Sequence, residues 1–128
     1  APGHTADSMI IEVPGYIMTG DFLFNGAGGT GRDDLPGGDT STHWDALAVL
    51  DRFEGETMVL SGHDPPGHEP GCLDWNRDNN PALCCSSYEE YECWQRAEWQ
   101  RLGSVSRMPV ALPANLSGNV PDKIPWLQ

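Results

Sequence analysis

The sequence predicts a small α/β domain, and three features of its pattern predict this class. Short runs of β-branched and apolar residues at 9–13, 16–19 and 57–60 are typical of strands. Between the second and third runs, the apolar side chains of residues 44–50 recur at helical spacing. The length of 128 residues is that of one domain. We therefore expect strands and helices to share one core.

The first two strands are expected to pair as a β-hairpin. The run 9–13 is separated from the run 16–19 by Pro14 and Gly15, which together are a turn signal. Asp21 follows directly after the second run. The hairpin thus places an acidic side chain at the end of a strand.

A glycine-rich segment, residues 25–38, lies between the hairpin and the expected helix. A loop of this length inside a domain is usually functional or disordered. A Thr or Ser at 40–42 is expected to cap the helix, which should end near Phe53. A buried strand over 57–60 then leads into the loop 61–64.

The composition changes near residue 65, after which Pro, Cys and Trp become more frequent. We expect residues 1–68 to form the compact α/β part. Residues 69–128 should form a C-terminal extension that packs on the same domain.

One helix is expected in this extension, over residues 88–102. Its start is marked by a capping box, formed either by Ser86 with Glu89 or by Ser87 with Glu90. The tail beyond it is expected to be extended and irregular because it contains four prolines. These are Pro109, Pro113, Pro121 and Pro125.

The formal net charge of −12 excludes two classes of partner. Residues 1–64 carry 11 acidic and two basic side chains. Such a surface repels nucleic acid and anionic membranes, so neither is an expected partner. No apolar run is long enough to span a membrane, and no signal peptide is visible.

The four cysteines have no Cys-x-x-Cys spacing, which argues against a structural zinc knot. Three disulfide pairings are open to four cysteines. Reduced thiols of an intracellular protein are the favoured interpretation. The cysteines are Cys72, Cys84, Cys85 and Cys93.

Three residues with metal-binding side chains lie at the ends of the expected strands. His4 precedes the first strand, Asp21 ends the second and His63 follows the third. Side chains at strand ends can converge on one edge of a sheet, and imidazole with carboxylate suits zinc or iron. We therefore expect a metal site there. His43 is expected at the surface of its helix, and His68 is a weaker metal candidate.

The segments that contain these residues resemble the later motifs of the metallo-β-lactamase superfamily. They are Pro2–Ser8, Thr19–Phe24 and Ser61–Asp64, in the order and spacing of that superfamily. The loop Gly29–Asp39 is similar to the Gly-Arg-Thr-Asp loop of its glutathione-recognising branch, most of all in the persulfide dioxygenases. Pro113–Asn115 resembles the C-terminal segment of that group.

The resemblance implies a fold and a role for each residue. The fold would be the C-terminal half of an αββα sandwich, because the superfamily's first motif, His-x-His-x-Asp-His, has no counterpart in this sequence. His4 and Asp21 would bind metal. His63 would hold a second metal in the hydrolases, or lie unliganded near the iron of the dioxygenases. Arg32, with Asp34 in the same loop, would recognise a carboxylate of glutathione, which a guanidinium binds through two hydrogen bonds.

Three functions are compatible with this resemblance. The first is an Fe(II)-dependent dioxygenase that oxidises glutathione persulfide, or a related thiol persulfide, to sulfite. The second is a glyoxalase II-type thioester hydrolase with one or two Zn²⁺ ions. In the third, the chain is an inactive fragment or a subunit that needs a separate N-terminal half or a homo-oligomer. No catalytic residue beyond the metal ligands is assigned, and the cytoplasm or mitochondrial matrix is the implied compartment.

One departure from the dioxygenase pattern lies inside the loop. Asp33 stands where that pattern has Thr. The segment from Asp21 to Arg32 is also longer than is usual for the branch. Both differences bear on substrate recognition more than on the fold.

Overall fold

A three-stranded sheet organises the chain in the computed structural model, which describes residues 1–64, 66–104 and 107–127. Strand β2 (Tyr16–Gly20) lies between β1 (Ile11–Val13) and β3 (Met58–Ser61). β1 pairs antiparallel with β2, with Val13 opposite Tyr16, and β3 pairs parallel to β2. The predicted hairpin, the third strand and the α/β class are confirmed.

The helix expected between β2 and β3 is present in two segments. α1 (Thr40–Ala46) continues directly into the 3₁₀ segment η2 (Leu47–Arg52). The predicted cap at residues 40–42 is wrong, because the carboxylate of Asp39 accepts a hydrogen bond from the Thr42 amide at 2.7 Å. Asp is as good an N-cap as Ser, and its charge also favours the positive end of the helix.

The predicted helix of the second half is α3 (Tyr88–Leu102), and Ser87 caps it by accepting from the Glu90 amide at 3.2 Å. The prediction that 69–128 holds only one helix is wrong. It also contains α2 (Leu73–Asn79), α4 (Met108–Ser117) and the 3₁₀ turn η3 (Pro125–Leu127).

The two additional helices were not predicted because the residues at their ends, or prolines within them, are not typical of helices. The sulfur of Cys72 caps α2 by accepting from the Trp75 amide at 3.4 Å, and Cys is not a usual N-cap. In α4, Pro109 lies in the first turn, where its missing N–H has no partner to lose. Pro113 lies inside α4. The expected irregular tail is therefore helical over these two prolines.

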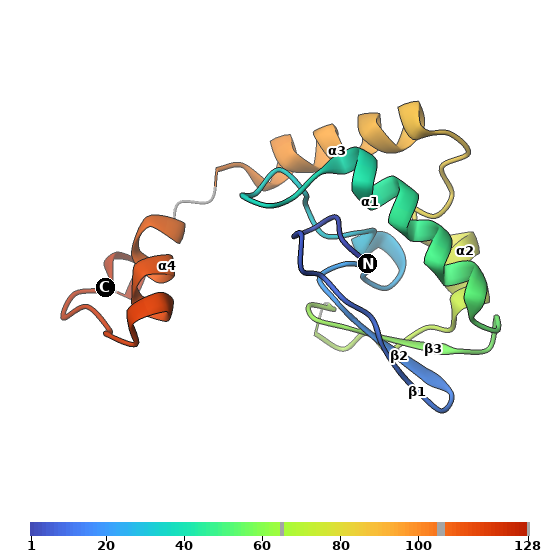
Figure 1. Ribbon diagram of the computed structural model, residues 1–128, viewed down its shortest axis with the longest axis horizontal. Helices are drawn as coiled ribbons and strands as arrows, with labels where there is room; N and C mark the ends of the chain where they lie inside the picture. Colours follow the sequence, from blue (N-terminus) through green and yellow to red (C-terminus); the bar gives the residue numbers. More distant parts are fainter. Residues whose placement is uncertain (65, 105–106, 128) are drawn as a thin grey trace.

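Figure 1 shows α1, α2 and α3 on one side of the sheet, where the core lies. The buried core side chains are Ile17, Phe22, Leu23, Leu50, Val59 and Leu73. The opposite face of the sheet is apolar but uncovered: Ile11, Tyr16 and Met18 are 51%, 45% and 41% exposed. Within the described residues, the apolar side chains on this face of the sheet are therefore largely exposed.

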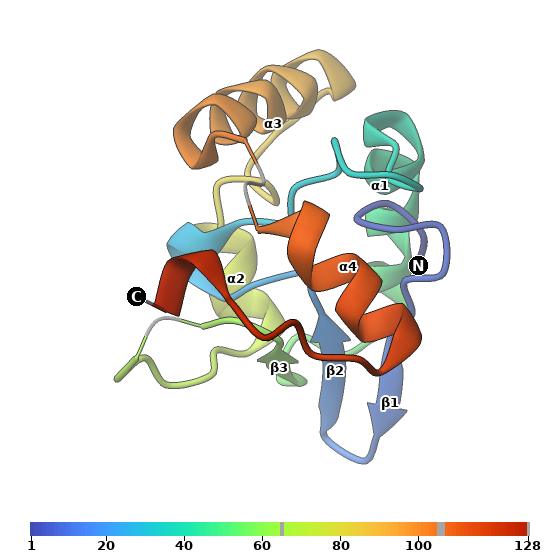
Figure 2. The ribbon, with the colours of Figure 1, turned by 90° about the vertical axis from the view of Figure 1, so that its left-hand side faces the viewer.

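Helix α4 contributes nothing to this core. It buries none of its side chains and stands apart from the sheet in Figure 1, while Figure 2 views the molecule from the α4 side. Among the residues described here, no helix is both long and apolar enough to cross a membrane.

The glycine-rich loop, residues 25–38, is held in place by contacts with α3. The Thr30 hydroxyl lies 3.0 Å from the Tyr91 hydroxyl, and the Gln95 amide donates to the Gly31 carbonyl at 3.0 Å. Thr30, Tyr91 and Gln95 are all buried. The loop is thus part of the packed interior and not a free connection.

Candidate metal centre

Asp21 occupies the centre of a group of three residues at one edge of the sheet. It follows β2 directly, and its two carboxylate oxygens face two imidazoles. Oδ2 lies 3.6 Å from His4 Nε2, and Oδ1 lies 3.5 Å from His63 Nε2. The structure thus brings together the three residues that the sequence predicts as metal ligands, and we call them the sheet-edge triad.

The parallel pairing of two strands creates this arrangement. Asp21 and the loop that carries His63 both follow the C-terminal ends of parallel neighbours, β2 and β3. Chain segments at such ends share one edge of a sheet. Gly62 allows the close approach, because a Cβ at this position would collide with the Asp21 carboxylate. The Gly62 amide also donates to the Gly20 carbonyl at 2.9 Å.

His4 is oriented by the backbone of the glycine-rich loop. Its Nδ1 lies 2.6 Å from the carbonyl oxygen of Arg32. A carbonyl oxygen can only accept, so Nδ1 carries a proton and Nε2 is the ring nitrogen that faces Asp21. Gly31 makes the approach possible, because a Cβ there would collide with the Asp21 carbonyl. A hydrogen-bonded Nδ1–H of this kind is what orients metal-binding histidines.

His63 is the exposed member of the triad. Its side chain is 75% exposed, against 18% for His4 and 32% for Asp21. The edge of its ring faces Phe24, with 6.2 Å between the ring centroids. His63 is therefore the least constrained of the three donors.

The next residue, Asp64, was missed by sequence reasoning. Its carboxylate accepts from the Asn25 backbone amide at 3.0 Å and from the Asn25 side-chain amide at 2.7 Å. Burial acts to raise the pKa of Asp64, but hydrogen bonds such as those from Asn25 outweigh it and hold the pKa below its ordinary value. Asp64 thus fastens the His63 loop to the interior.

The same asparagine joins a buried amide network. Asn25 Oδ1 accepts from the Asn76 side chain at 2.9 Å, and Asn76 Oδ1 accepts from the Gly26 amide at 2.8 Å. Asn76 lies on α2, far along the chain. No local pattern in the sequence marks such a pair, because asparagines near glycines read as turn residues.

The donor set of the triad fits a metal ion. Two donors bound about 2.1 Å from one tetrahedral ion lie about 3.4 Å apart, close to both His–Asp separations. Each imidazole faces a different oxygen of Asp21, which suits a carboxylate that bridges two ions. In the described ranges, no group of three or more His, Cys, Asp or Glu side chains is already arranged to hold an ion by itself. Within the described residues, the triad thus offers two His–Asp pairs and not a complete ligand set.

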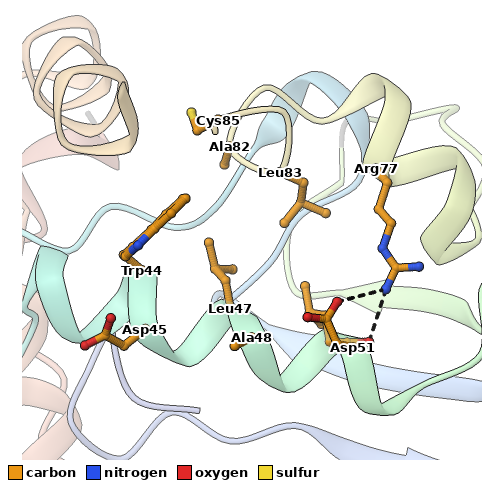
Figure 3. A pocket seen from close by; sticks show the side chains of 10 residues that line it. Trp44, Asp45, Leu47, Ala48, Asp51, Arg77, Ala82, Leu83 and Cys85 are labelled. Atoms are coloured by element: carbon orange, nitrogen blue, oxygen red, sulfur yellow. Dashed lines mark hydrogen bonds and ion pairs between the residues drawn. The ribbon is translucent and has the colours of Figure 1, made fainter. Parts of the chain in front are cut away.

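A hollow of about 330 Å³ opens at this edge, and His4 and Asp21 lie in its wall. The other lining residues are Thr5, Asp7, Ser8, Met9, Thr19, Gly20 and Phe22. A larger hollow of about 470 Å³ lies elsewhere, between η2 and the segment 77–85, and contains none of the triad (Figure 3). Arg77 closes one end of it by pairing with Asp51 at 3.4 Å.

The structure brings Arg32 and Asp34 together, but against each other. Arg32 Nε and Nη2 each donate to one oxygen of Asp34 at 2.7 Å, and Nη1 donates to the Gly103 carbonyl at 3.0 Å. The hydrogen bonds from Arg32 hold the pKa of Asp34 below its ordinary value. The Arg32 guanidinium, which was expected to bind a carboxylate of the substrate, therefore binds a carboxylate of the chain itself.

Two other histidine predictions have different outcomes. His43, expected at the surface, is fully buried. His68 is exposed and lies outside the triad. The four cysteines, all of them among the described residues, form no disulfide.

Comparison with known proteins finds curated relatives of similar sequence. No family model matches the sequence. The chain is 32% identical over 128 residues to a β-lactamase hydrolase-like protein of Xylella fastidiosa (strain 9a5c), covering 95% of this chain and 30% of the relative. A hydroxyacylglutathione hydrolase of Idiomarina loihiensis is 35% identical over 63 residues, which is 49% of this chain and 23% of the relative.

Two solved structures are also similar. ETHE1 from Myxococcus xanthus matches with a TM-score of 0.77 and 33% identity, over 90% of this chain and 50% of that chain. TTHA1623 in a di-iron-bound form matches with a TM-score of 0.55 and 33% identity, over 62% of this chain and 38% of that chain. The chain spans half of the ETHE1 structure and about a third or less of the curated relatives it matches.

Proposed function

This chain belongs to the metallo-β-lactamase superfamily, and we propose that it contributes an iron site to a dioxygenase that oxidises glutathione persulfide. The observation that carries the proposal is the sheet-edge triad, with Asp21 between two imidazoles and His4 held in the Nδ1–H tautomer. Mononuclear iron oxygenases bind iron through two imidazoles and one carboxylate and leave other positions open. This chain would supply the carboxylate, Asp21, and one imidazole, His4, and the second imidazole would come from the other half of the domain.

In this proposal His4 Nε2 and Asp21 hold the ion. Bound Fe(II) supplies the redox chemistry that allows dioxygen to react with a thiol persulfide. The balanced reaction takes glutathione persulfide, dioxygen and water to glutathione, sulfite and two protons. The outer sulfur loses four electrons, dioxygen gains them, and the S–S bond breaks. The hollow beside His4 and Asp21 gives the outer sulfur access to the site.

The glutathione part of the substrate is assigned to Arg32. A guanidinium binds carboxylate in a planar, two-bond geometry, and glutathione carries two carboxylates. Asp34 now holds that position, so substrate has to displace it or bind beside it. The acidic surroundings make a local cation necessary for an anionic substrate.

The test measures iron content and oxygen uptake in the protein that contains this chain. We expect about one iron per chain and oxygen uptake that depends on glutathione persulfide, with sulfite as the product. Absence of both iron and uptake would reject the proposal.

A zinc thioester hydrolase is the second candidate, because His4 and His63 face different oxygens of Asp21. This geometry suits a carboxylate between two ions, which would activate water for attack on a glutathione thioester. The Idiomarina loihiensis relative, named as a hydroxyacylglutathione hydrolase, supports a glutathione thioester as substrate.

His63→Ala separates the two candidates. In the hydrolase it removes the second ion and most of the activity, whereas in the dioxygenase it leaves iron binding intact. His68→Ala is the matched control, because His68 is an exposed imidazole of the same loop region outside the triad. Retention of metal content after His63→Ala counts against the hydrolase.

A third proposal is that the chain needs a second half of the domain. The uncovered sheet face, with Ile11, Tyr16 and Met18 exposed, supports it, and so does a triad that lacks ligands. The second half is either part of the same polypeptide or a separate subunit, and a homo-oligomer is the alternative. Tight binding of one metal and full turnover by this chain as a monomer would exclude it.

A further inference from the structure

A second His–Asp arrangement lies inside the protein, away from solvent. The side chains of Asp33 and His43 are both 0% exposed, with 3.2 Å between Asp33 Oδ2 and His43 Nδ1. We call these two residues the buried pair. Asp33 Oδ1 also accepts from the Thr40 hydroxyl at 2.9 Å, and His43 Nε2 donates to the Phe22 carbonyl at 2.9 Å.

The hydrogen bonds of the buried pair satisfy both ring nitrogens of His43. The Phe22 carbonyl only accepts, so Nε2 carries a proton. Nδ1 lies within hydrogen-bond distance of the Asp33 carboxylate, so both ring nitrogens have a partner. Apolar side chains of similar volume could fill the same space at no greater cost in stability. The presence of a fully satisfied ionic pair therefore calls for a role other than packing.

The contacts of the buried pair reach the backbone beside His4 and Asp21. The His43 ring packs so closely on Gly3 that a Cβ there would collide with it, and Gly3 precedes His4. His43 Nε2 holds the carbonyl of Phe22, which follows Asp21. Asp33 follows Arg32, whose carbonyl holds the Nδ1 proton of His4.

Two aromatic rings lie close to the His43 ring. The His43 ring lies 4.9 Å from the Phe22 ring and 5.9 Å from the Tyr91 ring, centroid to centroid. Helix α1 is in turn tied to the first segment, because the Asp39 amide donates to the Gly3 carbonyl at 3.0 Å. The buried pair thus contacts all three segments that carry His4, Asp21 and Arg32.

We infer that Asp33 and His43 are positioning residues for the proposed metal site. They fix the backbone of Gly3, Phe22 and Arg32 so that His4 presents Nε2, and not Nδ1, to Asp21. This inference rests on the proposed function only in taking a metal ion as the ligand of His4 and Asp21. The positioning of His4 is a property of the protein without metal.

Two conservative variants each remove one of the two hydrogen bonds of the His43 ring. His43→Asn keeps an N–H near the position of Nδ1 and removes the donor to Phe22. His43→Gln keeps an N–H near the position of Nε2 and removes the partner of Asp33. Asp45→Asn is the control, because Asp45 is an exposed carboxylate on the same helix.

The first measurement is imidazole ¹⁵N NMR of His4 in the metal-free chain. We expect the Nδ1–H tautomer in the wild-type protein and in Asp45→Asn. We expect a mixture of tautomers in His43→Asn and a smaller shift in His43→Gln, which keeps the donor to Phe22 but removes the partner of Asp33. An unchanged tautomer population in folded His43→Asn overturns the inference.

The second measurement is Co²⁺ titration followed by visible absorption. Loss of an outer partner of a metal ligand costs about 10–100-fold in affinity, so we expect that loss in His43→Asn and a smaller loss in His43→Gln. The titration uses the protein that contains this chain, and its failure to bind Co²⁺ would reject the proposed metal site alone, because the tautomer measurement still decides the positioning role.

Circular dichroism shows which variants fold. If His43→Asn does not, Thr40→Val takes its place, since it removes only the hydroxyl that Asp33 accepts from. A partial shift of the His4 tautomer in the same direction supports the inference, and no shift contradicts it.

Discussion

The protein contains two His–Asp arrangements of the same chemistry in opposite environments. The sheet-edge triad is open, with 3.5–3.6 Å between its partners and a His63 side chain that is 75% exposed. The buried pair is closed, with 3.2 Å between partners and no exposure. The open arrangement leaves its donors free for an ion. The closed one has satisfied every donor and acceptor internally, which makes it a support and not a binding site.

The largest expected effect compares the same substitution in both arrangements. His43→Leu leaves the Asp33 carboxylate buried without its partner, and breaking a buried pair in this way costs about 3–5 kcal/mol. His63→Leu changes an exposed side chain and should stay within about 0.5 kcal/mol. Urea unfolding followed by tryptophan fluorescence measures both. Equal losses would contradict the difference between the two arrangements.

The next largest effect is expected on metal affinity, where Asp21 of the sheet-edge triad should matter and an exposed carboxylate beside it should not. Asp21→Ala removes a proposed ligand and should lower Co²⁺ affinity by more than the about 100-fold that loss of an outer partner can cost. Asp7→Ala is the control, because Asp7 is exposed and lies in the wall of the same hollow. A similar loss in both variants would indicate general charge attraction and no defined site.

Acid should weaken the attachment of the His63 loop. The pKa of Asp64 is lower in the folded protein than the unfolded value of 3.8, so its stabilisation is complete above about pH 5. It is lost as pH falls through 3.8 toward the folded pKa. Asp64→Asn should therefore reduce the slope of unfolding free energy against pH between about 5 and 3. An unchanged slope would show that Asp64 is not a titrating contact.

The smallest expected effect on stability comes from breaking the Arg32–Asp34 ion pair. Asp34→Asn removes one charge of a pair at the surface, which should change the free energy of unfolding by no more than about 1 kcal/mol. It should also tighten glutathione binding, because it removes the carboxylate that competes for Arg32. Calorimetric titration measures this, with Asp45→Asn as control. Weaker binding would mean that Asp34 itself contacts the ligand.

Local patterns predicted the open arrangement better than the closed one. Asp21 and His63 could be placed because each follows a strand, and strands and the hairpin are marked by short-range patterns. His43 was misplaced because a polar residue in the first turn of a helix usually faces water. Its partner Asp33 lies in a loop, and only the folded chain brings the two together.

Helix ends explain the remaining errors. The helix cap was expected at residues 40–42 and not at Asp39, because several neighbouring residues are good caps. Helix α4 was missed because prolines were counted without regard to their position in the helix. The superfamily and its fold, in contrast, could be predicted from motifs in residues 1–64. Those motifs combine glycines with His and Asp residues at fixed spacing, which few unrelated sequences do.

The uncovered apolar face of the sheet sets the colloidal behaviour of this chain. Its net charge of −12 repels other copies, while the face around Ile11, Tyr16 and Met18 attracts them. Salt shortens the range of the repulsion to about 10 Å at 0.1 M and leaves the apolar attraction in place. The isolated chain is therefore expected to stay dispersed at low ionic strength and to self-associate as salt is added.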